Sequence, residues 1–138
     1  MAAQRYAVQF DGYCPDPEDT PDASGIYVVY TGHEIDEDVV RLRKLLYIGE
    51  ADDIRDRLTH HERLKDWLVY LRRDEQLWFS FALIPITSTR MRVEAAEIFR
   101  HKPICNTEYK NKFPFDLTEI VNRGTHEYLD DTFIVSRT

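Results

Sequence analysis

The chain has 138 residues, of which 43% are hydrophobic and 31% charged, an ordinary globular composition that excludes a collagen-like or disordered chain. The formal net charge of −7 argues against an affinity of the whole surface for nucleic acid. The longest nearly apolar run, Leu77–Ile86, is too short for a membrane span, so no membrane partner is expected. The N-terminus resembles no signal peptide and the two cysteines have no metal-binding spacing, so a cytoplasmic protein with reduced thiols is expected.

Runs of β-branched and aromatic residues predict the strands. In chain order, strands are expected over residues 6–10, 24–31, 44–49 and 76–86, with strand-like segments at 118–121 and 132–135. The two strands at 24–31 and 44–49 carry apolar residues on both sides of the alternation. The sheet is therefore expected to be covered on both faces.

Helices are expected between these strands. Asp52 or Asp53 is a suitable N-cap for a helix that ends near His61, and a second helix reaches about Arg73. A third helix is expected over Thr89–His101 and should stop before Pro103. This order favours an α+β fold with a small, mainly antiparallel sheet flanked by helices.

Six side chains stand out as candidates for one site: Tyr27, Tyr47, Arg57, His61, Glu94 and Asn106. The two tyrosines lie on neighbouring predicted strands and are expected to point to the same side of the sheet. Arg57 and His61 are four residues apart and would share one helix face. There a guanidinium can bind phosphate oxygens and an imidazole can accept a proton near neutral pH.

Glu94 is expected close to the apolar face of its helix, where a carboxylate is desolvated unless it meets a cation. A hard divalent ion held by one carboxylate, by waters and by substrate phosphate suits this position. Glu97 is expected on a different face, with Arg100 or His101 as its surface partner.

The sequence resembles the GIY-YIG nuclease superfamily over about residues 24–106. The resemblance is carried by Gly25-Ile26-Tyr27, Tyr47-Ile48-Gly49, Arg57 ten residues after Tyr47, His61, Glu94 and Asn106. It implies a GIY-YIG-like nuclease domain over residues 24–112. An N-terminal strand and acidic loop at 1–23 would precede it. Residues 113–138 would form a C-terminal extension, with a hairpin packed on the same domain as one arrangement.

The resemblance further implies a metal-dependent endonuclease that hydrolyses DNA, with RNA as an alternative substrate. Tyr27 or Tyr47 would orient or deprotonate the attacking water, aided by His61, and Arg57 would stabilise the charge on the transferring phosphate. Glu94 would bind a single Mg²⁺ or Mn²⁺ ion, and Asn106 would position the wall of the active site. No further DNA-binding module is expected in these 138 residues, so the domain would act through short non-specific, nicked or branched contacts or take its specificity from a protein partner.

Basic residues near the predicted site are candidates for phosphate contacts. They are Arg41, Arg43, Lys44, Arg55, Arg63, Lys65, Arg90 and Arg92. Glu50 stands where some members of the family carry Lys, and it is expected either to turn outward or to help bind the metal.

Each site residue taken alone also has a structural explanation. The tyrosines would be core residues, and Arg57 with His61 would be a solvated helix face paired with Asp53 or Glu62. Glu94 would be a partner of Arg90 four residues earlier, and Asn106 would be a turn residue. The alternative function is therefore a catalytically silent domain of the same fold that binds a protein or nucleic acid. The acidic ends of the chain would then suit a basic protein.

Overall fold

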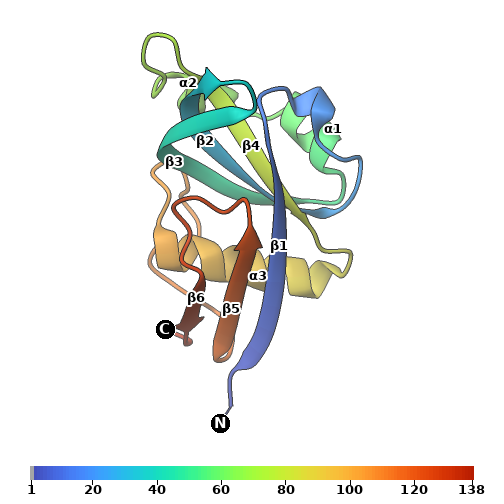
Figure 1. Cartoon of the computed structure of the whole chain (residues 1–138). Helices are drawn as coiled ribbons and strands as arrows, with labels where there is room; N and C mark the ends of the chain where they lie inside the picture. The colour runs from blue at the N-terminus through green and yellow to red at the C-terminus, as the bar shows by residue number, and fades with distance from the viewer. Residues whose placement is uncertain (1) are drawn as a thin grey trace.

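The computed structural model describes residues 2–138 and shows an α+β fold in which helices flank a six-stranded sheet (Figure 1). The strands are β1 (Gln4–Cys14), β2 (Gly25–Asp36), β3 (Val39–Ala51), β4 (Gln76–Leu83), β5 (Thr118–Gly124) and β6 (Thr132–Val135). The helices are α1 (Ile54–Thr59), α2 (Leu64–Leu68) and α3 (Thr87–His101), with a short 3₁₀ turn at Pro17–Asp19. No helix in the described part of the chain is long and apolar enough to cross a membrane.

The sheet is mixed, which corrects the prediction of a mainly antiparallel sheet. Its strand order is β3-β2-β4-β1-β5-β6, and β1 and β5 run parallel while the other neighbours are antiparallel. The difference arises from β1, which is longer than the predicted strand at residues 6–10. Its first part, Gln4–Phe10, pairs with β5, and its last part, Asp11–Cys14, pairs with β4.

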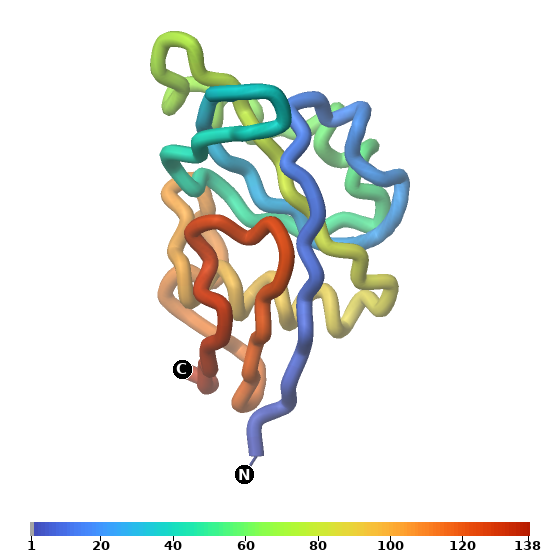
Figure 2. Tube along the Cα trace, in the orientation of Figure 1, coloured from blue at the N-terminus to red at the C-terminus, as the bar shows by residue number. Residues whose placement is uncertain are grey.

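Strand β1 therefore joins two parts of the molecule (Figure 2). The hairpin of β2 and β3 lies with β4 on one side of it, and β5 and β6 lie on the other. The C-terminal strands at residues 118–124 and 132–135 are thus an extension of the same sheet, reached through β1.

Apolar side chains cover both faces of the β2–β3–β4 part of the sheet, as predicted. On one face, Val28 belongs to a buried cluster with Val93 of α3. On the other face, Val29 belongs to a second cluster with Ile54 of α1 and Trp67 of α2. Full burial of such side chains contributes about 1.5–3 kcal/mol each to folding. The two clusters hold α1 and α3 on opposite sides of the sheet.

Local signals set the ends of these helices. Asp53 caps α1, and its side chain accepts a hydrogen bond from the Asp56 N–H at 3.0 Å, which confirms one of the two predicted caps. Helix α1 ends at Thr59, before the predicted end, and α2 is also shorter than predicted. Helix α3 ends as expected before Pro103, where Lys102 takes a left-handed conformation with φ of 48°.

Candidate active site

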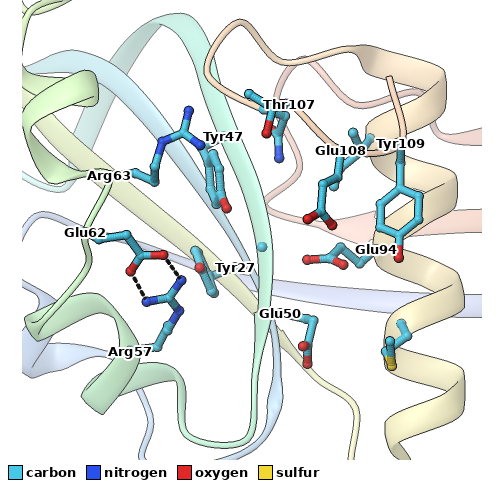
Figure 3. A pocket seen from close by; sticks show the side chains of 14 residues that line it. Tyr27, Tyr47, Glu50, Arg57, Glu62, Arg63, Glu94, Thr107, Glu108 and Tyr109 are labelled. Carbon is cyan, nitrogen blue, oxygen red and sulfur yellow. Dashed lines mark hydrogen bonds and ion pairs between the residues drawn. The ribbon is translucent and has the colours of Figure 1, made fainter. Parts of the chain in front are cut away.

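A cleft of about 380 Å³ lies where the ends of β2 and β3 meet α1 and α3 (Figure 3). Its lining is Tyr27, Tyr47, Gly49, Glu50, Arg57, Glu62, Arg63, Met91, Glu94, Ile98, Asn106, Thr107, Glu108 and Tyr109. Five of the six residues singled out from the sequence are in this set. The sixth, His61, is outside the lining and is hydrogen-bonded to the hydroxyl of Tyr27.

The two tyrosines lie on the same side of the sheet, which confirms the prediction from strand alternation. Tyr27 of β2 is opposite Gly49 and Tyr47 of β3 is opposite Val29, and the two rings are stacked with centroids 6.2 Å apart. A Cβ atom at Gly49 would collide with the ring and hydroxyl of Tyr27. The glycine of the second tripeptide is therefore needed for the close approach of Tyr27 to β3.

His61 holds the hydroxyl of Tyr27 at 2.7 Å through its Nε2 atom. Its Nδ1 accepts the Arg63 N–H at 3.1 Å, so in the neutral imidazole the proton is assigned to Nε2, which donates to Tyr27. Burial and the nearby Arg57 lower the pKa of His61 to about 4. The ring is thus neutral at pH 7 and donates to a Tyr27 hydroxyl that stays protonated, because burial raises the pKa of Tyr27.

Arg57 is paired with Glu62, one of the two carboxylates that the structural explanation of this helix face offers as partners. Both guanidinium NH groups donate to the carboxylate, at 2.5 and 2.7 Å (Figure 3). The hydrogen bonds from Arg57 lower the pKa of Glu62 to about 2, so the pair is charged at neutral pH. A fork-shaped carboxylate therefore occupies the geometry that a phosphate would use on Arg57. The structure thus selects Glu62 over Asp53, whose side chain caps α1 instead.

Glu94 lies in the other half of the cleft with two further carboxylates, Glu50 and Glu108 (Figure 3). Burial, followed by the nearby Glu50 and Glu108 charges, raises the pKa of Glu94 to about 8. The desolvation expected from the helix pattern is therefore present. The described residues contain no group of three or more acidic, His or Cys side chains arranged to hold a metal ion.

The side-chain amide of Asn106 is hydrogen-bonded to the main chain of β3 and is not free to contact a substrate. Its Oδ1 accepts the Ile48 N–H and its Nδ2 donates to the Ile48 carbonyl oxygen, both at 2.9 Å. The neighbouring Cys105 N–H donates to the Leu46 carbonyl at 2.9 Å. Since β3 is an edge strand, these bonds replace a missing neighbour and hold the strand that carries Tyr47. Asn106 is thus a positioning residue.

Arg63 is the only one of the eight candidate phosphate-binding residues that the described cleft lining contains. Arg90 corrects the prediction most clearly, because its side chain is buried and donates to Glu50 at 2.7 Å and to Asp52 at 2.5 Å. It holds Glu50 in place and cannot meet a substrate. The remaining candidates line other parts of the surface or make other contacts: Arg41, Arg43, Lys44, Arg55, Lys65 and Arg92.

The predicted surface position of Glu97 is wrong. Its side chain is fully buried and accepts a hydrogen bond from Asn122 of β5 at 3.0 Å. His101 is close, at 3.6 Å from the carboxylate, but its Nδ1 bonds the Glu97 main-chain carbonyl at 2.9 Å. The face of α3 that carries Glu97 is covered by the C-terminal strands, whose position the sequence did not indicate.

No family model matches the chain, and comparisons with curated proteins and with solved structures find no match. The side chains of the cleft and their geometry therefore carry the functional assignment.

Proposed function

We propose that this protein is a metal-dependent endonuclease of the GIY-YIG type that hydrolyses DNA phosphodiester bonds. One observation carries the proposal. The side chains of Tyr27, Tyr47, Arg57 and Glu94 come from β2, β3, α1 and α3, and all of them line one cleft. Two hydroxyls, a guanidinium and a desolvated carboxyl are the groups that can orient water, neutralise a phosphate and bind a cation.

In this proposal the two halves of the cleft have different tasks. The Tyr27 hydroxyl, held by His61, positions the attacking water. Arg57 binds the oxygens of the transferring phosphate, on which negative charge develops. Tyr47 contributes a second hydroxyl beside that of Tyr27.

The carboxylate half of the cleft suits a hard divalent cation. Mg²⁺ is commonly held by one or two carboxylates together with waters and phosphate oxygens, so a full protein cage is not required. Glu94 is the proposed ligand, because burial and neighbouring carboxylates raise its pKa to about 8, and a bound cation would favour its ionised form. When bound, the cation supplies positive charge to the phosphate and to the leaving oxygen.

The test is cleavage of supercoiled plasmid DNA with Mg²⁺ or Mn²⁺, with and without EDTA. We expect nicked and linear products that EDTA abolishes. Arg57→Ala should lower the rate by a factor of at least about 100, the typical effect of removing one positioned donor. Glu94→Gln should abolish cleavage, because a neutral amide is a poor ligand for Mg²⁺.

Two exposed residues outside the cleft provide matched controls. Arg72→Ala and Glu37→Gln make the same charge changes away from the lining and should leave cleavage unchanged. If wild type cleaves neither DNA nor RNA with either metal, the proposal is wrong and the silent interaction domain is the better reading. Equal losses in the controls would show that net charge, rather than the cleft, controls activity.

A further inference from the structure

A second groove, of about 600 Å³, lies toward the opposite end of β2 from the candidate active site. It is lined by Gly12, Tyr13, Pro15, Glu34, Asp38, Val39, Val40, Trp78 and Thr125. None of these residues lines the first cleft. Tyr27 and Glu34 are seven residues apart on β2, so at about 3.3 Å per residue the two sites are separated by roughly 23 Å along the strand.

The groove combines apolar walls with negative charge. Its apolar residues include Val39, of which 47% is exposed, and Trp78, of which 4% is exposed. Its only charged members are Glu34 and Asp38, and no basic residue is in the described lining. Both acidic residues are exposed, and neither forms an ion pair within the described chain.

Strand register separates the charges on this hairpin. Glu34 is paired with Val40, and both residues line the groove. The preceding pair, His33 and Arg41, lines a different depression. The other basic residues of the hairpin also lie elsewhere, since Arg43 lines that same depression and Lys44 lies over the Tyr70 ring. The carboxylates therefore remain available to a cation from outside the chain.

We propose that this groove is a docking site for a basic segment of a partner protein. A Lys or Arg side chain would pair with Glu34 and Asp38, and a neighbouring apolar side chain would pack on Val39, Val40 and Trp78. The charge complementarity favours this occupant, since two carboxylates repel the phosphates of a nucleic acid. The inference does not depend on the nuclease activity, but such a partner could bring the chain to its substrate.

The two tryptophans of the chain make the test specific, because one serves as the control for the other. The indole N–H groups of Trp67 and Trp78 are both buried without a hydrogen-bond acceptor among the described residues. Trp67 lies in the cluster on the other face of the sheet. A short synthetic peptide of Arg-Ala-Leu repeats, titrated into ¹⁵N-labelled protein, should shift the NMR signal of Trp78 and leave that of Trp67 in place.

Two double variants distinguish peptide binding in the groove from non-specific attraction of the peptide by the net charge of −7. Glu34→Gln with Asp38→Asn should raise the Kd of the peptide by at least about threefold, the effect of losing two exposed ion pairs. Asn tolerates the positive φ of 58° at position 38, so this variant should fold. Asp36→Asn with Glu37→Gln removes the same charge from the same hairpin outside the groove lining and should change the Kd less than twofold.

Several results would overturn the proposal. They are an unshifted Trp78 signal, equal binding of a Glu-Ala-Leu peptide, and equal losses in the two double variants. A shift of Trp78 on addition of duplex DNA in place of the peptide would assign the groove to nucleic acid. Because binding is measured without metal or cleavage, its failure is distinct from a failure of the proposed nuclease function.

Discussion

The pairing of Arg57 with Glu62 leads to a prediction about substrate binding. If Arg57 binds a phosphate, that phosphate must displace the Glu62 carboxylate, which makes two hydrogen bonds to the same guanidinium. Glu62→Gln keeps the size of the side chain and removes its charge. We therefore expect the variant to bind DNA more tightly than wild type.

The magnitude follows from the exposure of the pair. The Arg57 side chain is 34% exposed and that of Glu62 is 64% exposed, so water screens their attraction. Exposed pairs with good geometry contribute about 0.5–1 kcal/mol. Removing this competition should lower the Kd for DNA by roughly two- to fivefold. The gain should shrink at high salt, because screening weakens the native pair as well.

Fluorescence anisotropy of a labelled duplex with EDTA measures the Kd without cleavage. Glu37→Gln is the matched control for the change in net charge and should have a smaller effect. In an Arg57→Ala background, Glu62→Gln should add little, because the group that it competes for is gone. Weaker binding by Glu62→Gln would refute the reasoning and would show that Glu62 holds Arg57 in its binding orientation.

Three further predictions concern the support of the cleft and the buried carboxylate. Asn106→Ala should lower the free energy of unfolding, measured by urea denaturation, by about 2–3 kcal/mol, because it leaves the buried N–H and carbonyl of Ile48 without partners. A loss below about 0.5 kcal/mol, the smallest net value of one hydrogen bond, would show that Asn106 does not hold β3 in place. Gly49→Ala should displace Tyr27 and cost about 1–3 kcal/mol, and loss of the Tyr27–His61 contact should be visible as a shift of the His61 NMR signals. Burial raises the folded-state pKa of Glu97 to about 8, so the folded state binds the proton more tightly than the unfolded state. Stability from this group is therefore present below about pH 4.5 and falls as the pH rises to about 8, and Glu97→Gln should flatten that part of the unfolding profile; an unchanged profile would assign the pH dependence to other groups.

Features that depend on neighbours along the chain could be predicted from the sequence. Tyr27 and Tyr47 were expected on one side of the sheet from their places on neighbouring strands, and the register of β2 with β3 confirms this. The cap at Asp53 and the end of α3 before Pro103 are also local effects. For the candidate site, five of the residues that line the cleft were indicated by the order and spacing of the motifs rather than by these local signals.

Other features depend on segments that are distant in the sequence. The parallel pairing of β1 with β5 joins residues more than 100 positions apart, and no local pattern specifies it. That pairing places Asn122 against α3 and so buries Glu97, which the helix pattern alone assigned to the surface.

By itself, the sequence determined the local strand segments and the cap of α1, because these depend on neighbouring residues, and its motifs indicated five residues of the cleft lining. Only the tertiary structure decided what those side chains meet there. Arg57 pairs with Glu62, and Asn106 forms hydrogen bonds with the main chain of the edge strand β3. Arg90 is buried and pairs with Glu50. The physical reason is that burial and ion pairing depend on which elements pack together, and that packing is settled by the whole chain at once.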